Sequence, residues 1–172
     1  MAVYALGDAV PQIHETAYVH PEAVIIGDVT IGPQSSVWPG AVIRGDDGPI
    51  TIGARTSVQD NCVLHTVASS PTTVGDDVTL GHLAHLEGCT IHSGSLVGVG
   101  AVVLHRAVVH TGALVAANAT VLDDMVVPAG ALAVGTPAKI KEKAVRPDII
   151  SDSAAHYVER LPQYSRDLRR ID

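Results

Sequence analysis

Aliphatic residues recur every six positions over most of the chain, interrupted twice by short polar segments. Four positions after most of them stands a small residue such as Ala, Ser or Thr. Neither an α-helix nor an ordinary β-strand has a six-residue period, whereas a parallel β-helix with three short strands per coil does. The sequence therefore predicts an all-β fold, a parallel β-helix of hexapeptide repeats with about seven coils. The aliphatic positions are Ile13, Val19, Ile25, Ile31, Val37, Ile43, Ile52, Val58, Leu64, Val74, Leu80, Leu86, Ile91, Val97, Val103, Val109, Val115, Val121 and Val127.

The pattern changes after Pro137. We therefore expect a β-helix domain over residues 1–137, with repeats from about residue 13 to residue 135, and a C-terminal helical segment over residues 138–172. A thin rod of this kind leaves its flanks exposed, and burying one face against another copy removes that exposure. We therefore expect a homotrimer.

The C-terminal segment has helical spacing from Ser151 to Arg170, with Ala154, Val158 and Leu161 on one stripe. This predicts an α-helix packed along the β-helix. Ser151 or Ser153 is expected to cap it, and Pro162 is expected to kink or split it.

Composition narrows the possible functions. The chain is 47% hydrophobic but only 3% aromatic, with no Phe, which suits a narrow interior filled by aliphatic side chains. A net charge of −7 argues against nucleic-acid binding, because phosphate contacts need clustered Lys and Arg. Cys62 and Cys89 are expected to be small buried residues in a reducing compartment. No signal peptide and no membrane span of ~20 apolar residues is evident, so we expect a cytoplasmic protein with no membrane partner.

Two polar segments, Gly45–Pro49 and Thr66–Thr73, break the period after the same face of the predicted prism. We expect both to be loops. Loops that leave a rigid scaffold at one place commonly line a functional site.

Three histidines and a glutamate stand near these breaks. In the six-residue register, His65 and Glu87 follow buried positions of one face, in a column with Arg44, and adjacent strands lie ~4.8 Å apart. His85 also points outward, beside Glu87. His82 stacks with Asp60 at a corner of the prism, about one face away. The pattern therefore predicts a metal site that a neighbouring subunit completes, and the alternative is a set of interfacial histidines without metal.

The other histidines are expected to have polar roles at the surface. They are His14, His20, His92, His105, His110 and His156.

Longer motifs add a family resemblance. The runs VWPGAVIRGDDGPITIGARTSVQDNCVLH and TLGHLAHLEGCTI resemble the γ-class carbonic anhydrases and their bacterial relatives. The discriminating parts are RGD at Arg44–Asp46, QDN at Gln59–Asn61, LH at Leu64–His65 and GH at Gly81–His82. The resemblance implies a left-handed β-helix trimer with one Zn²⁺, Fe²⁺ or Co²⁺ at each subunit interface. It also implies reversible hydration of CO₂, a small-molecule substrate, to bicarbonate by metal-bound hydroxide.

The resemblance also assigns roles to residues. His65 matches the first metal ligand, and His82 matches the ligand offered across the interface. The remaining matches are Arg44 and Asp46, an interfacial ion pair; Gln59, which orients the metal-bound water; Asp60, a supporting carboxylate; and Tyr157, an active-site tyrosine.

The sequence departs from the family at the third ligand. That ligand is a histidine five residues after the GH histidine, and here the position is Glu87, with His85 two residues earlier. Zinc accepts either a His₂Glu or a His₃ set. His85 is favoured by ligand type and Glu87 by position. A carboxylate ligand would leave the bound water less acidic, so weaker or more alkaline activity is expected if Glu87 binds. The segment Thr66–Thr73 has no Glu or His to serve as a proton shuttle.

Two other function classes fit the repeats. One is a hexapeptide acyltransferase, with a histidine as general base and CoA along the coils. The other is a weakly active or inactive trimeric protein with a structural metal.

Overall fold

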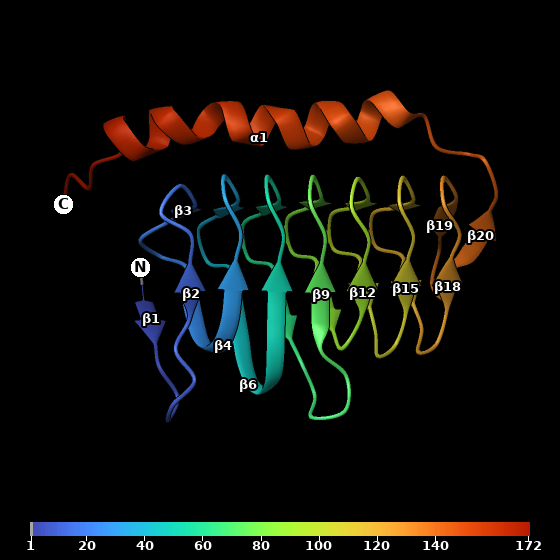
Figure 1. Cartoon of the computed structure of the whole chain (residues 1–172). Coiled ribbons are helices and arrows are strands. Elements are labelled where there is room, and N and C mark those ends of the chain that lie inside the picture. Colours follow the sequence, from blue (N-terminus) through green and yellow to red (C-terminus); the bar gives the residue numbers. More distant parts are fainter. Residues whose placement is uncertain (1) are drawn as a thin grey trace.

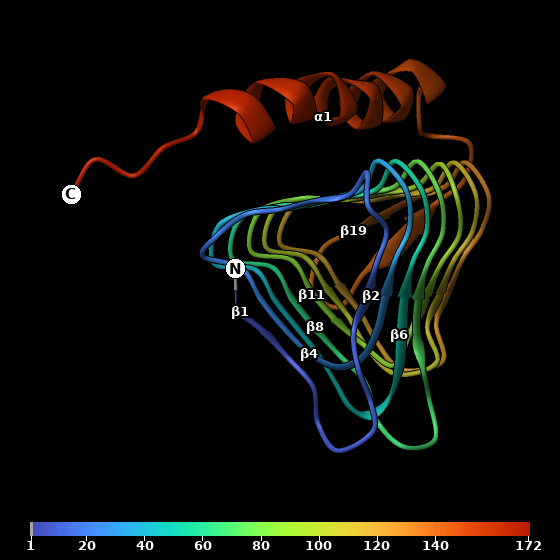
Figure 2. The same cartoon turned by 60° about the vertical axis from the view of Figure 1, so that its left-hand side comes forward.

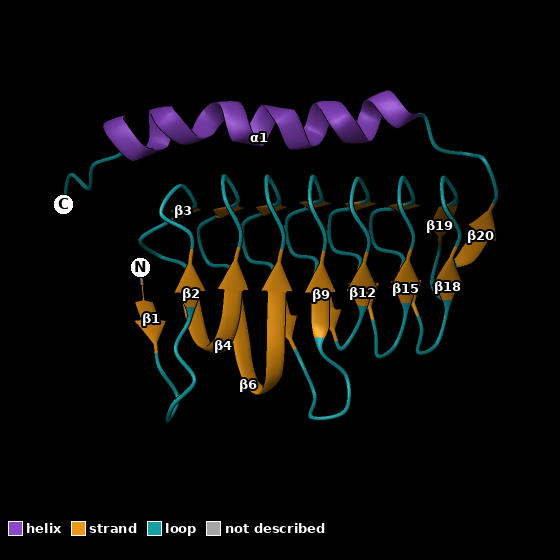
Figure 3. Ribbon diagram, viewed as in Figure 1, coloured by secondary structure: helices purple, strands orange, loops and turns teal. Residues whose placement is uncertain are grey.

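The computed structural model describes residues 2–172, and in them the chain winds into a three-sided parallel β-helix with one long helix beside it (Figures 1 and 2). Successive coils stack strand on strand in parallel register, as Figure 3 shows for the face nearest the viewer. The predicted fold class, a hexapeptide-repeat β-helix with a C-terminal helix, is confirmed.

Each coil contributes to three faces. The first face contains β1 (Ala2–Tyr4), the first part of β4 (Val24–Ile31), the first part of β6 (Val42–Ile52), β8 (Val63–His65), β11 (His85–Glu87), β14 (Val102–Val103) and β17 (Thr120–Val121). The second face contains β2 (Gln12–Ile13), the later parts of β4 and β6, β9 (Thr72–Val74), β12 (Thr90–Ile91), β15 (Val108–Val109) and β18 (Val126–Val127). The third face contains β3 (Tyr18–Val19), β5 (Ser36–Val37), β7 (Ser57–Val58), β10 (Thr79–Leu80), β13 (Leu96–Val97), β16 (Leu114–Val115), β19 (Leu132–Val134) and β20 (Lys139–Lys141).

The interior is the predicted aliphatic ladder. From Ile25 to Val127 every predicted aliphatic position is at most 1% exposed, and Ile13 and Val19 of the first coil are partly buried against the same core. The small residues at the corners, such as Ala101 and Ala107, are also buried. Because the buried residue of each strand points inward, the residue after it points outward, and this alternation positions the candidate site.

The segment Gly45–Pro49 is not a loop, contrary to our prediction. It belongs to β6, which continues around the corner from the first face to the second and pairs with β4 on both sides of a bulge between Gly27 and Val29. Pairing with the preceding coil overrides the local turn signal of the glycines and Pro49. The segment Thr66–Thr73 does contain a turn, closed by a bridge between Val67 and Ser70.

The helix α1 (Pro147–Asp167) lies along the β-helix and contacts β5, β7 and β10 of the third face (Figure 1). It begins before the predicted start, with Arg146 as N-cap residue in place of Ser151 or Ser153, and Pro162 does not split it. Before it, β20 pairs antiparallel with β19 at the end of the third face. No helix within residues 2–172 combines the length and apolar character needed to cross a membrane.

Four of the five aromatic residues gather between α1 and the third face. The Trp38 ring centroid lies 4.8 Å from that of Tyr164 and 5.5 Å from that of Tyr157, both on α1, and 5.6 Å from that of Tyr18. Trp38 Nε1 donates to the hydroxyls of Ser36 and Ser57. The few aromatic side chains therefore attach the helix to the β-helix instead of filling its interior.

Candidate metal centre

Arg44, His65 and Glu87 form the predicted column on the first face. Strand register aligns Arg44 with His65 and His65 with Glu87. Each follows a buried aliphatic residue, so each side chain points away from the core. The repeat alone thus stacks a cation, an imidazole and a carboxylate in adjacent coils.

His65 lies between two carboxylates. Its Nε2 is 3.0 Å from Oδ1 of Asp46, and its Nδ1 is 3.1 Å from Oε1 of Glu87. Asp46 also pairs with the guanidinium of Arg44. The imidazole is thereby fixed in orientation from both sides, in a strongly acidic environment that favours cations.

These contacts shift the carboxylate pKa values. Burial acts to raise the pKa of Asp46, but hydrogen bonds from Arg44 and His65 outweigh it and the pKa is lowered. The hydrogen bond from His65 lowers the pKa of Glu87, against an opposing effect of burial, and His85 and the charge of His105 add to the lowering. Both carboxylates are therefore ionised at neutral pH.

Both candidates for the third ligand are in this group. His85 and Glu87 lie two residues apart on β11 and point to the same side, with His85 Nε2 3.3 Å from Glu87 Oε2. Glu87 stands in direct register with His65, whereas His85 aligns with Val63. The structure thus brings both groups together, with Glu87 nearer to His65 in register.

A second group lies at the corner between the third and first faces. His82 Nδ1 is 2.9 Å from Oδ2 of Asp60, and the backbone N–H of His82 donates to the buried side chain of Gln59 at 3.2 Å. His82 and Asp60 line a pocket of about 280 Å³ together with Tyr157 of α1. Burial raises the pKa of Tyr157, and the charge of Asp60 raises it further.

The predicted residues therefore form two groups within one chain. Arg44, Asp46, His65, His85 and Glu87 meet on the first face, whereas Gln59, Asp60, His82 and Tyr157 meet under α1. His82 contacts the second group and His65 the first, and that a neighbouring subunit brings the two histidines together stays a prediction.

The first group contains donors that suit a metal ion. One ligand atom each from Asp46, Asp47 and His65 lie within 4.8 Å of one another. Carboxylate oxygen and imidazole nitrogen are both ligands that Zn²⁺ and Fe²⁺ accept. These donors suit such a metal, but His65 is the only one of them that the family resemblance also names as a ligand.

Sequence reasoning missed His105 and Asp47 as members of the site. His105 was assigned a general surface role, yet its Nε2 lies 3.6 Å from Oε1 of Glu87. It occupies a corner turn, one residue beyond the column position Leu104, and the repeat register gives no direction for corner side chains. Asp47 lay in the segment that was expected to be a loop.

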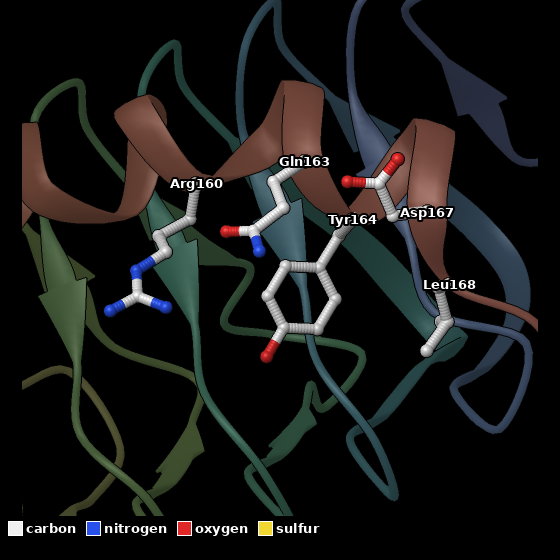
Figure 4. A pocket seen from close by; sticks show the side chains of 5 residues that line it. All are labelled: Arg160, Gln163, Tyr164, Asp167 and Leu168. Carbon is white, nitrogen blue, oxygen red and sulfur yellow. The ribbon is translucent and has the colours of Figure 1, made fainter.

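Another pocket, of about 210 Å³, lies at the end of α1 near Leu168 (Figure 4). Its other lining residues, Arg160, Gln163, Tyr164 and Asp167, all come from α1. Arg160 and Tyr164 also line the pocket at His82. The C-terminal part of α1 therefore borders the group that contains His82, and not the column of Arg44, His65 and Glu87.

Comparison with known proteins adds to this geometry. The family model "Bacterial transferase hexapeptide (six repeats)" matches residues 11–45. Gamma carbonic anhydrase 1, mitochondrial, of Arabidopsis thaliana is 40% identical over 158 residues, which cover 87% of this chain and 58% of that protein. This chain thus spans under three-fifths of the length of that relative.

A carbonic anhydrase of Geobacillus kaustophilus is 41% identical over 164 residues, covering 94% of this chain and 90% of that protein. Among solved structures, a Bacillus cereus protein described as a candidate acetyltransferase has a TM-score of 0.93 and 34% identity, over 95% of this chain and 96% of that one. The similarity thus extends over nearly the full length of both chains. Together with the His65 column, it shows that this chain belongs to the γ-class carbonic anhydrase-like family of hexapeptide-repeat proteins.

Proposed function

We propose that this protein is a metal-dependent carbonic anhydrase-like enzyme that reversibly hydrates CO₂ to bicarbonate at the subunit interfaces of a homotrimer. The observation that carries the proposal is the stack of Arg44, His65 and Glu87 on the first face, with Asp46 bonded to both Arg44 and His65. The Geobacillus relative, which bears the name carbonic anhydrase over nearly the same length, supports it.

The metal is proposed to be Zn²⁺, or Fe²⁺ or Co²⁺, held by His65, by Glu87 or His85, and by His82 of the partner subunit. When bound, such a metal supplies Lewis acidity that lowers the pKa of a coordinated water toward neutrality. Asp60 holds Nδ1 of His82 and leaves Nε2 free to bind, which is the role of a carboxylate behind a ligating histidine.

Gln59 and Tyr157 are proposed to position the reactants. The side-chain oxygen of Gln59 accepts from the backbone of His82, so its amide N–H groups are left to orient a water or an oxygen of the substrate. A tyrosine hydroxyl is protonated at neutral pH, and burial moves the pKa of Tyr157 further upward, so it can donate a hydrogen bond into the same pocket.

Both free thiols fit a cytoplasmic setting. Burial raises the pKa of Cys62 and of Cys89 to about 12, so neither is a reactive thiolate at neutral pH. We propose the reducing cytoplasm as the location, with no role for either cysteine in the reaction.

Stopped-flow CO₂ hydration on metal-quantified protein tests the function, with His65→Ala as the inactive variant and His14→Ala as a matched control. Activity should follow metal content, fall at least about 100-fold in His65→Ala and stay unchanged in His14→Ala. If Glu87 is a ligand, the midpoint of the pH–rate profile should lie above neutrality. A fully metallated protein that hydrates CO₂ no faster than His65→Ala would refute the function.

The likeness to the Bacillus cereus structure supports a second candidate, acyl transfer from acetyl-CoA. In that case His82, held by Asp60, would act as general base towards an acceptor hydroxyl. Calorimetric titration with CoA separates the two, because the anhydrase has no need of CoA. If the protein binds metal but shows neither CO₂ hydration nor CoA binding, the third candidate, a structural metal, remains.

A further inference from the structure

One stripe of α1 faces the corner that carries His82. Its residues recur one, four and eight positions after the first, the spacing of neighbours on one side of a helix. They are His156, Tyr157, Arg160 and Tyr164. All four line the pocket of about 280 Å³ that also contains His82 and Asp60. Figure 4 shows Arg160 and Tyr164 extending to the same side of the helix. The helix therefore brings a guanidinium into the pocket of His82, where the proposed function gives it no role.

Arg160 differs from most arginines of the chain in its surroundings. Six others form an ion pair with a carboxylate, namely Arg44, Arg55, Arg106, Arg146, Arg166 and Arg170. Arg160 has no such partner among the described residues, and the positions three and four residues away on α1 hold no acid that could reach it. Its side chain is exposed, so its N–H donors are available to a ligand from solution.

The carboxylate of this pocket is already engaged. Oδ2 of Asp60 lies 2.9 Å from Nδ1 of His82, so its charge is directed at the imidazole. Burial raises the pKa of Tyr157, the charge of Asp60 adds to the rise, and the charge of Arg160 acts in the opposite direction. The guanidinium thus acts on the same hydroxyl that lines the pocket.

Two kinds of donor therefore stand side by side in this pocket. Tyr157 and Arg160 are three positions apart on α1, which makes their side chains neighbours on the helix surface. A phenolic hydroxyl and a guanidinium both donate hydrogen bonds to oxyanions, and the planar guanidinium matches the two coplanar oxygens of a carboxylate-type anion.

We propose that Arg160 and Tyr157 form an anion subsite beside His82 that holds bicarbonate, the product of the proposed hydration. The subsite lies within one subunit. Its identification with bicarbonate rests on the proposed function. Because Arg160 is exposed to water, the affinity is expected in the millimolar range. The competing arrangement is an arginine that serves only the solubility of the helix.

Relaxation of ¹³C-labelled bicarbonate tests the proposal on chelator-treated full-length protein, in which no metal competes for the anion. Binding to the protein shortens the transverse relaxation time of the labelled carbon, and ¹³C-labelled acetate serves as a second carboxylate probe. Sodium chloride holds the ionic strength constant. Arg160→Gln should bind bicarbonate about tenfold more weakly, because a charge-assisted hydrogen bond is lost. Arg160→Lys, which keeps the charge but not the planar pair of donors, should fall between Arg160→Gln and the wild type.

Arg166→Gln is the matched control, because Arg166 lies on the same helix and pairs with Asp167. It should bind bicarbonate like the wild type. If Arg160→Gln does not fold, as judged by its circular dichroism, Arg160→Lys takes its place.

Three results would overturn the proposal: a wild type that leaves the relaxation of bicarbonate unchanged, an Arg160→Gln variant with wild-type affinity, or binding of acetate without bicarbonate. Binding of bicarbonate, alone or with acetate, that is weakened in Arg160→Gln supports it. In dehydration assays of the metal-loaded protein, the KM for bicarbonate should rise about tenfold in Arg160→Gln. An unchanged KM in an active variant refutes this inference alone. Bicarbonate binding that depends on Arg160, in a metal-loaded protein that hydrates no CO₂, refutes the proposed activity alone.

Discussion

At the scale of single residues, the site depends on the outward position that follows each buried aliphatic residue of the first face. Parallel stacking places these side chains in adjacent coils at a spacing of ~4.8 Å, so like charges there would repel. The chain alternates instead: Arg44 faces Asp46, and His65 lies between Asp46 and Glu87. Each charged side chain therefore has a partner of opposite charge or a hydrogen-bonding imidazole, which allows four polar side chains to pack together over an aliphatic core.

Substitutions of two glycines, Gly27 beside this group and Gly94 at a corner near the start of α1, should differ in their cost to stability. Gly27 has φ +77°, and a Cβ there would lie 2.3 Å from the carbonyl oxygen of Gly45, next to Arg44 and Asp46; Gly94 has φ +65° with open space around it. Gly94→Ala should therefore lose only about 1 kcal/mol of stability, for the left-handed conformation. Gly27→Ala should lose about 3 kcal/mol or more, because backbone must move as well. Urea unfolding of both variants at equal protein concentration measures the difference.

Equal losses in the two variants would show that backbone contact at Gly27 adds nothing to its conformational cost. A Gly27→Ala variant that also binds metal more weakly would connect β4 to the position of Asp46, which lies in the strand paired with it.

At the scale of elements, α1 packs on the β-helix through the buried side chains of Ile150, Ala154 and Leu161 and through aromatic contacts with Trp38. Trp38 is the only tryptophan of the chain, and it is 5% exposed. Tyr157 and Tyr164 cover it from the helix, in edge-to-face arrangements. Its fluorescence therefore reports directly on whether α1 is in place.

Tyr164→Ala should shift the emission of Trp38 to longer wavelength and reduce stability by about 2 kcal/mol, because it removes the ring nearest to the indole. Arg166→Ala is the control, since the Arg166 side chain is 72% exposed and pairs with the adjacent Asp167. Fluorescence spectra and thermal unfolding measure both effects. An unchanged emission maximum in Tyr164→Ala would contradict the assigned packing.

The six-residue period was sufficient to predict the β-helix, its buried ladder and the column of Arg44, His65 and Glu87. Predictions from short local patterns were less accurate. The glycines and Pro49 suggested a loop where pairing with β4 forms a strand, and Ser151 suggested a cap that the helix does not use. In the first case pairing with another coil decided the outcome, and a local pattern does not contain that contact. In the second the helix begins before both serines, so neither stands at its N-cap.

The side-chain geometry at the corners could not be predicted either. The register identifies inward and outward positions on a face, but a corner residue such as His105 takes its direction from the turn. Its contact with Glu87 depends on Gly88 and on the stacking of three turns.

At the scale of the whole molecule, one subunit keeps His82 and His65 on different sides of a corner. A shared site therefore needs a neighbour that covers the first face, where Val63 of β8 is 39% exposed beside His65. Sedimentation equilibrium should give three times the chain mass for the wild type.

Val63→Asp should convert this trimer to monomers, because it places a charge in the proposed interface. Val126→Asp should leave the trimer intact, since Val126 is 51% exposed but lies on the second face. A trimer that survives Val63→Asp would place the interface elsewhere.

The path of α1 has a consequence for how the protein unfolds. Coils of a solenoid contact only their neighbours, so its two ends tend to fray independently. Here the helix starts beside the last coils and returns to the first, where Tyr164 meets Tyr18 (Figure 1). Loosening either end therefore disturbs a structure shared by both. Because α1 couples distant coils, the β-helix can unfold in one cooperative step.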